Sequence, residues 1–168
     1  TLLAAIKQTV SKNTEVTFSP DAENLHGAEA VIVVVGEMPY AEMKGDRSDL
    51  SLAAGDAALI EKAKAAGVPV VTVLYSGRPL VLGKSLAAST AFVAAWLPGT
   101  EGAGVTDVLF GDFKPTGKLP RPWPHDNSEL SSAAFAVPTA QPLFAPGFGL
   151  TYDAGTKPKE FKTAALNE

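Results

Sequence analysis

The sequence of 168 residues contains no cysteine, only two histidines and no long apolar run. Without cysteine the chain has no disulfide, no thiolate metal site and no cysteine nucleophile, and two histidines are too few for a histidine-rich metal cluster. No stretch reaches the ~18 consecutive apolar residues that a transmembrane helix needs, so we expect no membrane partner. We also expect neither a metal ion nor another cofactor.

The sequence also has little positive charge: it contains 14 Lys and Arg and 18 Asp and Glu, which give a formal net charge of −4. This balance argues against a nucleic-acid partner. Hydrophobic residues make up 46% and charged residues 19%, which is typical of a globular protein and not of a disordered one. The chain is long enough to bury a core as one domain, or at most as two small ones.

The chain begins at Thr1 and opens directly into an amphipathic segment. It shows no basic stretch followed by an apolar core and a cleavage site, so nothing at its start is typical of a signal peptide. We expect the chain to be cut out of, or processed from, a longer one. The missing signal therefore says nothing about the compartment.

Hydrophobic periodicity predicts alternating strands and helices. Helical spacing predicts helices over residues 2–10, 54–66, 80–88 and 105–110, and β-branched runs predict strands over 15–18, 30–35, 68–74 and 91–97. The last three strands are apolar on both faces, which is typical of buried strands in a parallel sheet. The pattern predicts an α/β fold: a three-layer α/β/α sandwich with a mostly parallel, flavodoxin-like doubly wound sheet.

The C-terminal third changes character. Residues 117–120 could form an edge strand, and a series of prolines then interrupts every regular pattern: Pro122, Pro124, Pro138, Pro142 and Pro146. We expect an irregular, extended, Pro-rich wrap over the surface. From Asp153 to the end the chain is a polar tail, residues 153–168, which we expect to fray.

Ligands in open α/β sheets bind beyond the carboxyl ends of the strands, so the loops after residues 35, 74 and 97 are the candidate sites. The first of these loops is the longest and the most charged, and it carries Glu37 and Glu42. A carboxyl group there can serve as a general acid if its surroundings favour the protonated form. The alternative is that Glu42 is a solvated loop residue paired with Lys44 or Arg47.

Other candidates have simpler explanations. The glycine-rich turn over residues 99–104 could bind a phosphate or a nucleotide, but it lacks the dinucleotide and P-loop patterns, and Glu101 would repel an anion. Tight packing of a strand against a helix accounts for its glycines. Ser76 lacks a nucleophile elbow. We expect Arg78 to form a structural ion pair and both tryptophans to lie in the core or under the wrap, although either could stack on a sugar: Trp96 and Trp123.

Taken together, several stretches resemble the second domain of a family 3 glycoside hydrolase, in the branch of plant exo-β-glucanases and bacterial β-glucosidases. The first is Val-Val-Val-Gly-Glu-Met-Pro-Tyr-Ala-Glu-Met-Lys-Gly-Asp at residues 33–46. Others follow in the same order at residues 74–79, 94–102, 105–113, 116–120, 142–144 and 147–150. The resemblance runs from about Leu2 to Tyr152 and implies one α/β-sandwich domain over residues 1–152.

In that family the active site lies at the seam of two domains. A (β/α)₈ barrel holds an aspartate nucleophile, and the sandwich supplies the general acid/base from the motif Glu-x-Pro-Tyr-x-Glu-x-x-Gly-Asp. The resemblance assigns that role to the second glutamate, Glu42. It implies a structural or orienting role for Glu37 and supporting roles for Lys44 and Asp46.

The resemblance implies a retaining β-glucosidase or exo-1,3/1,4-β-glucanase that removes terminal non-reducing β-D-glucosyl residues. The expected partners are a β-glucoside or β-glucan oligosaccharide and an N-terminal (β/α)₈ barrel. Such a barrel takes about 250 residues, for which this chain has no room, so the chain alone should be inactive. The alternative is a free-standing carbohydrate-binding or protein-interaction module without catalysis. The resemblance favours the periplasm or secretion, whereas the residues themselves leave the compartment unknown.

Overall fold

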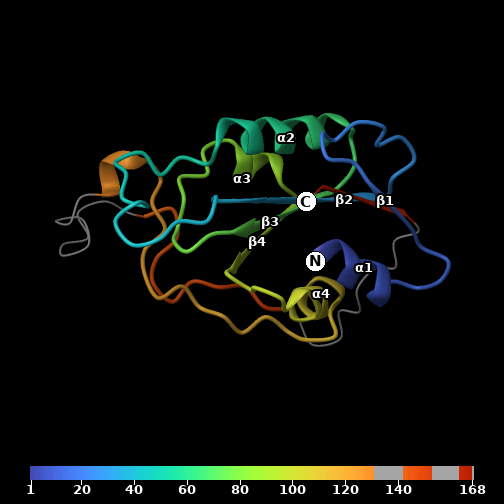
Figure 1. Ribbon diagram of the computed structural model, residues 1–168. Coiled ribbons are helices and arrows are strands. Elements are labelled where there is room, and N and C mark those ends of the chain that lie inside the picture. The colour runs from blue at the N-terminus through green and yellow to red at the C-terminus, as the bar shows by residue number, and fades with distance from the viewer. Residues whose placement is uncertain (131–141, 153–162, 168) are drawn as a thin grey trace.

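The computed structural model describes residues 1–130 and 142–152, and the backbone of residues 163–167. Its centre is a parallel sheet in the order β1-β5-β2-β3-β4. The strands are β1 (Glu15–Phe18), β5 (Thr163–Asn167), β2 (Ala30–Gly36), β3 (Val70–Tyr75) and β4 (Ala91–Trp96). Figure 1 shows helices on both faces: α2 (Ala54–Ala65) and α3 (Ser85–Ala88) on one, α1 (Leu2–Thr9) and α4 (Gly102–Phe110) on the other. The predicted three-layer sandwich is confirmed.

Alternate residues of each inner strand enter two separate cores. In β2, Val31, Val33 and Val35 pack under α2 and α3, while Ile32 joins the core under α1 and α4. Strand β3 repeats the pattern with Leu74 on the first face and Val73 on the second. Because successive side chains of a strand point to opposite faces, a run apolar at every position is what a sheet covered on both faces requires.

Three predicted elements differ from those observed, two in extent and one in burial. The helix expected over 105–110 begins earlier, at Gly102, so residues 102–104 of the predicted glycine-rich turn belong to α4. The helix expected over 80–88 is only α3, because Val81 hydrogen-bonds the backbone of Leu50 and Leu52, and Gly83 adopts a φ of +52°. These features hold residues 80–84 outside a helix. Strand β4, expected to be buried, has mostly half-buried residues, because it is an edge strand that pairs only with β3 among the described strands.

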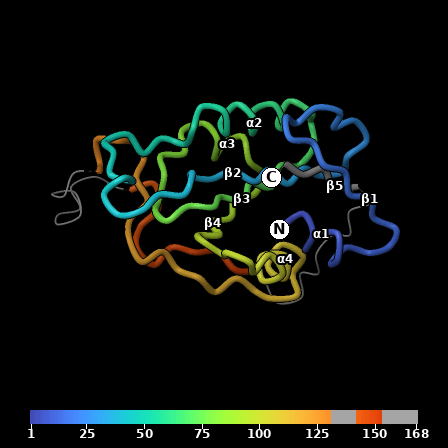
Figure 2. The backbone as a smooth tube through the Cα atoms, viewed as in Figure 1, coloured from blue at the N-terminus to red at the C-terminus, as the bar shows by residue number. Residues whose placement is uncertain are grey.

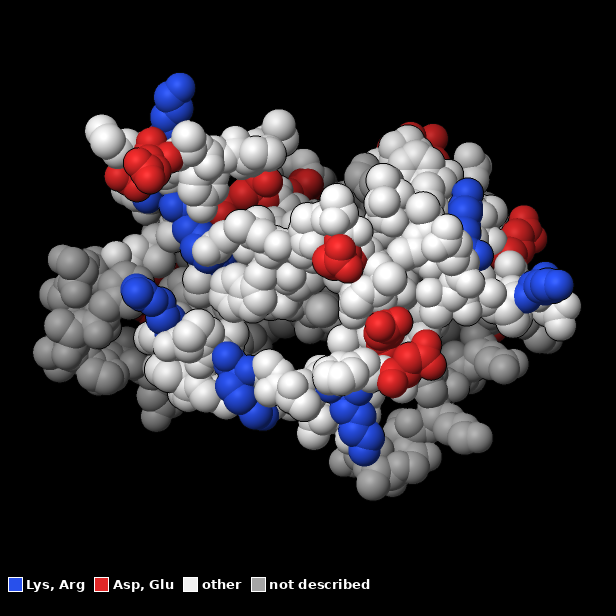
Figure 3. Space-filling model, turned by 60° about the horizontal axis from the view of Figure 1, so that its bottom comes forward, with Lys and Arg blue, Asp and Glu red and all other residues white. Residues whose placement is uncertain are grey.

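The C-terminal wrap is irregular, as expected, and its described part contains one short 3₁₀ helix, η1 (Asn127–Leu130). The edge strand predicted over residues 117–120 is wrong. Leu119 instead exchanges backbone hydrogen bonds with Phe148 and Gly147, which belong to another part of the wrap. Trp123 fixes the wrap to the body: its side chain is 2% exposed and its Nε1 donates to the carbonyl of Leu80 at 2.8 Å. Figure 3 turns this side forward and shows a largely uncharged centre.

The fraying expected for the tail is wrong for residues 163–167, which form β5 between β1 and β2; residues 153–162 lie outside the described part. The register pairs Glu15 with Thr163 on one side and Val31 with Ala165 on the other. Figure 1 shows this strand, in red, within the sheet, and Figure 2 shows the same pairs of helices on either side of the sheet. The backbone groups of β1 and β2 need partners, and β5 supplies them. In the described residues no helix is both long and apolar enough to cross a bilayer.

Candidate functional site

The candidate loop leaves the sheet at the carboxyl end of β2. Gly36 lies so close to β3 that a Cβ there would overlap the carbonyl oxygen of Tyr75. The next residue keeps this contact, since the backbone N–H of Glu37 donates to the same carbonyl at 3.0 Å. Glycine at position 36 therefore lets the loop begin tight against the neighbouring strand.

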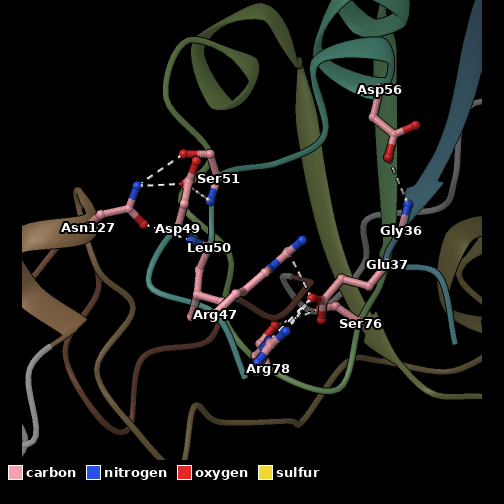
Figure 4. Close-up of polar contacts among 10 residues, drawn as sticks. All are labelled: Gly36, Glu37, Arg47, Asp49, Leu50, Ser51, Asp56, Ser76, Arg78 and Asn127. Carbon is pink, nitrogen blue, oxygen red and sulfur yellow. Dashed lines mark hydrogen bonds and ion pairs between the residues drawn. The ribbon is translucent and has the colours of Figure 1, made fainter. Parts of the chain in front are cut away.

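Glu37 is the buried anchor of this loop. Its side chain is only 7% exposed, and its Oε1 accepts hydrogen bonds from Arg47 Nη2 at 2.9 Å and from Arg78 Nη2 and Nε at 2.8 and 3.2 Å (Figure 4). Arg78 thus makes the structural ion pair that the sequence predicted. The bond to Arg47 joins the start of the loop to a point near its end, so the residues between them form a closed Ω-like excursion.

Tyr40 forms a second brace inside the loop. The guanidinium carbon of Arg78 lies 4.8 Å from the centre of the Tyr40 ring, within the range of a cation–π contact. Gly45 is so close to the ring that a Cβ there would overlap ring carbons. Sequence reasoning missed both residues, although the Pro39-Tyr40 pair followed by Gly45 was the signal of a packed turn.

Glu42 lies at the exposed tip of the loop, in a turn that spans residues 42–45. Within the described residues its carboxylate makes neither a hydrogen bond nor an ion pair. The pairing with Arg47 that the alternative interpretation expected is wrong, because Arg47 bonds Glu37 instead. Lys44 and Asp46 are also exposed, and no ion pair joins either of them to Glu42 in the part of the chain described. The loop thus holds one carboxylate buried and presents the other to solvent.

The far end of the loop is fixed to the wrap. Asn127 accepts a hydrogen bond from the backbone N–H of Leu50 at 2.8 Å and donates to Asp49 at 2.7 Å and to Ser51 at 3.2 Å (Figure 4). The Ser51 hydroxyl, the Ser51 N–H and the Asn127 amide lower the pKa of Asp49 below its usual value of 3.8. Nothing in the local sequence signals this contact, which joins residues far apart in the chain.

A third titratable group faces the base of the loop from α2. Burial raises the pKa of Asp56, while a hydrogen bond from the Gly36 N–H at 3.4 Å opposes that rise. Ser76 is 2% exposed and donates to the carbonyl of Arg78 at 2.7 Å, so it stabilises a turn. The described residues contain no cluster of His, Asp or Glu that could hold a metal ion.

The glycine-rich turn packs differently from the prediction. Gly102 lies against α1, where a Cβ would come within 3.1 Å of the Thr1 carbonyl oxygen and 3.3 Å of the Ala5 side chain. The glycine therefore permits close packing of two helices, α4 on α1, where close packing of a strand on a helix was expected.

These features define the class of the molecule: a doubly wound α/β sandwich domain whose candidate site lies in a braced loop beyond the carboxyl ends of its strands. The chain belongs to the family described as "Glycosyl hydrolase family 3 C-terminal domain", which matches residues 1–152. The resemblance found from the sequence is thereby confirmed.

Named relatives and solved structures agree with this assignment. A lysosomal beta glucosidase of Dictyostelium discoideum is 36% identical over 138 residues, covering 77% of this chain and 17% of the relative. A periplasmic beta-glucosidase of Salmonella typhimurium is 39% identical over 105 residues, covering 61% of this chain and 14% of the relative. The crystal structure of an exo-1,3/1,4-beta-glucanase from a Pseudoalteromonas species superimposes with a TM-score of 0.81 at 38% identity, covering 96% of this chain and 21% of that one. The chain thus matches between 14% and 21% of the length of these glycosidases.

Proposed function

We propose that this chain is the sandwich half of a retaining β-glucosidase or exo-1,3/1,4-β-glucanase and that Glu42 is its general acid/base. The observation that carries the proposal is the contrast between the two glutamates of the loop. Glu37 is buried and bonded to two arginines, whereas Glu42 is exposed and unpaired among the described residues. A proton donor must reach a substrate, which the exposure of Glu42 allows and the burial of Glu37 opposes.

The chemistry requires a second carboxyl group from outside this chain. Retaining glycosidases place their two carboxyl groups about 5–5.5 Å apart, so that one attacks the anomeric carbon while the other protonates the leaving oxygen and then deprotonates water. We assign the attack to an aspartate on a (β/α)₈ barrel docked over the carboxyl ends of the strands. Glu42 then supplies and removes the proton, and the substrate is a terminal non-reducing β-D-glucosyl residue of a β-glucoside or β-glucan.

The surface around Glu42 supports a docked partner. Four large apolar residues, three of this loop and one directly after β4, are exposed: Met38 84%, Tyr40 44%, Met43 84% and Leu97 73%. Tyr40 and Leu97 converge over Gly77, where a Cβ would lie within 3.3 Å of the Tyr40 hydroxyl and 3.7 Å of a Leu97 methyl. We call these four side chains the apolar rim. A barrel that covers the rim would exclude water from Glu42 and form the cleft in which a glucosyl residue binds.

The braces of the loop fit the same role. Glu37 and Arg47 close the base of the excursion, and Tyr40 is held by Arg78 and Gly45, so that the tip bearing Glu42 has a fixed position. In the proposal Glu37 is an orienting carboxylate. The supporting roles of Lys44 and Asp46 remain predictions.

The test uses a chimera in which residues 1–152 replace the matching domain of the Pseudoalteromonas exo-glucanase. In the chimera, Glu42→Ala should lower kcat/KM by about 10²–10⁴ on a glucoside with a poor leaving group, because departure then needs a proton. Glycosylation from an activated aryl glucoside should fall far less, since that leaving group needs no proton. Azide should restore turnover, because it attacks the covalent intermediate without base assistance and releases β-glucosyl azide.

Glu101→Ala is the matched control, because Glu101 is also an exposed glutamate beyond the carboxyl end of a strand. This variant should leave the activity on both substrates unchanged. Equal loss on both substrates in Glu42→Ala, or full activity on both, would remove Glu42 from the acid/base role.

A second candidate function is a non-catalytic interaction module, which the exposed apolar rim also favours. Calorimetry with the chain alone separates the two functions. Tight binding of a β-glucan oligosaccharide without a barrel would support the module, whereas the proposed half-site binds such a sugar weakly.

A further inference from the structure

Both methionines of the chain lie in the loop that follows β2. Met38 and Met43 are each 84% exposed, more than any other large apolar residue in the described part of the chain. Met43 is the residue directly after Glu42, whereas Met38 lies four positions before it. A methionine side chain is unbranched and polarizable, so it adapts to surfaces of different shape. The two methionines therefore match in type, loop and exposure but differ in their separation from Glu42.

Met43 also has an unusual backbone. Its φ is +66°, in the left-handed region that residues with a Cβ disfavour. Three other non-glycine residues in the described part share a positive φ, and each has an evident reason. Ala22 is buried in the core, and Asn24 belongs to a residue type that tolerates this conformation. Trp96 is half-buried, with its ring centre 6.2 Å from that of Trp123.

Neither packing nor backbone geometry accounts for a methionine at position 43. Its side chain is almost wholly exposed, and glycine would adopt the same φ without strain. The turn is held by other contacts, since the backbone N–H of Asp46 donates to the Met43 carbonyl at 3.2 Å. What remains is an apolar side chain beside Glu42 on a strained backbone, and such strain clusters at binding and catalytic sites.

The chemistry proposed for Glu42 indicates what this side chain would touch, so the inference rests on the proposed function. A general acid protonates the oxygen that joins the glucosyl residue to its leaving group. The glucosyl residue lies within reach of the nucleophile, so the leaving group lies on the side of the acid. Consecutive Cα atoms are only about 3.8 Å apart, so the side chain that follows Glu42 borders the space of the leaving group.

We propose that Met43 is a specificity-determining residue that contacts an apolar face of the leaving group. A thioether packs well against an aromatic ring, and it packs equally against the C–H face of a second sugar. Met43 then favours aryl and glycosyl leaving groups over small alkyl ones. Because its side chain is flexible, it selects for apolar surface and not for one exact shape.

The first experiment compares leaving groups in the chimera described above. Met43→Ala should lower kcat/KM about tenfold on phenyl β-glucoside and on a β-linked glucose disaccharide, but change it less than about twofold on methyl β-glucoside. A methyl group covers too little of the side chain to gain from it. Where breakdown of the covalent intermediate limits kcat, kcat should not change, because the leaving group has already departed. Met43→Leu should keep most of the preference.

Met38→Ala is the matched control, because Met38 has the same exposure and lies in the same loop. It should leave the ratio of kcat/KM for phenyl and methyl glucosides unchanged. If both methionines only contact a docked barrel, the two alanine variants should behave alike. An equal loss on both glucosides in Met43→Ala, or the same change of ratio in both variants, would overturn the proposal.

The second experiment uses the same contact in the reverse direction. An alcohol can replace water in the second step: its oxygen bonds the anomeric carbon, the bond to the aspartate breaks, and its proton goes to Glu42. With benzyl alcohol, Met43→Ala should lower the ratio of transfer to hydrolysis about tenfold. The ratio with methanol should stay as in the parent chimera. A parallel fall with both alcohols would contradict a contact with the apolar group.

Met43→Gly separates binding from backbone strain. In urea, the chain with Met43→Gly should unfold at a higher concentration than the chain with Met43→Ala, because glycine adopts the left-handed conformation freely. Both variants should nevertheless lose the leaving-group preference in the chimera. A preference that returns in Met43→Gly would show that strain, and not the side chain, sets it.

The outcomes for Met43 and Glu42 can be told apart. If Glu42→Ala fails its own test, the proposed function fails. If Glu42→Ala behaves as an acid/base variant while Met43→Ala keeps the ratio of the parent chimera for phenyl and methyl glucosides, only the inference about Met43 is overturned.

Discussion

At the scale of single residues, the turn that carries Glu42 depends on the packing of Tyr40 against Gly45 and Arg78. Gly45→Ala would push a methyl group into the Tyr40 ring, and because the ring is also held by Arg78, the turn must shift. We expect a loss of about 1–3 kcal/mol in the free energy of unfolding, as in other overpacked sites. Urea unfolding of the isolated chain measures it.

Gly104→Ala is the control for that change. Gly104 lies inside α4, and a Cβ there would meet nothing within 4 Å. Alanine is the better helix former, so this variant should gain about 0.5–1 kcal/mol. If both variants lost stability equally, the contact between Gly45 and Tyr40 would not be the cause.

Glu37 should matter more for stability than its partner Arg47. Glu37→Gln removes the charge from a side chain that is 7% exposed and bonded to two guanidinium groups. Hydrogen bonds to charged groups contribute about 1.5–3 kcal/mol, so we expect a loss in that range. Arg47→Ala should cost less, because the Arg47 side chain is 46% exposed and solvent weakens its ion pair. Thermal unfolding of the two variants compares them, and the opposite order would contradict the anchoring role of Glu37.

At the scale of elements, the sequence predicted those helices and strands that have a long, regular hydrophobic pattern. The strands at residues 30–36 and 70–75 and the helix at 54–65 have long, regular patterns, and all three were predicted. The shortness of α3 could not be predicted, because it depends on a pairing of Val81 with the chain near Ser51. β5 could not be predicted either. Its composition is that of a polar tail, and its place in the sheet comes from pairing with the backbones of β1 and β2.

The junction between the loop and η1 should respond to pH. The folded-state pKa of Asp49 is lowered, so its contribution to stability is complete above the unfolded value of about 3.8. That contribution is lost as the pH falls through the folded-state value. In Asp49→Asn, the midpoint temperature of thermal unfolding should therefore fall less steeply as the pH is lowered below about 4. Asn127→Ala, which removes one of the donors, should reduce the same decline; a slope unchanged in both variants would contradict this account.

At the scale of the whole molecule, the candidate site combines what the sequence shows with what only the fold provides. The sequence predicted the loop after β2 and both of its glutamates. It did not predict that Arg47 bonds Glu37, that Tyr40 is braced by Gly45 and Arg78, or that Asn127 reaches Leu50. Each of these contacts depends on side-chain packing or on chain segments that the tertiary fold brings together, so no local pattern encodes it.

The exposed apolar rim predicts that the whole chain associates with itself. Leu97 is 73% exposed and lies beside Tyr40, so an isolated sandwich presents apolar surface at the edge where a barrel is proposed to dock. Such surface promotes association when its partner is missing. Sedimentation of the chain should show a mass that rises with concentration, and Leu97→Asp should restore a monomer. Leu150→Asp is the matched control, because Leu150 is 76% exposed but lies on the C-terminal wrap. A wild-type chain that stays monomeric at high concentration would mean that the rim is too small to hold a partner domain, and the docking proposal would then need another surface.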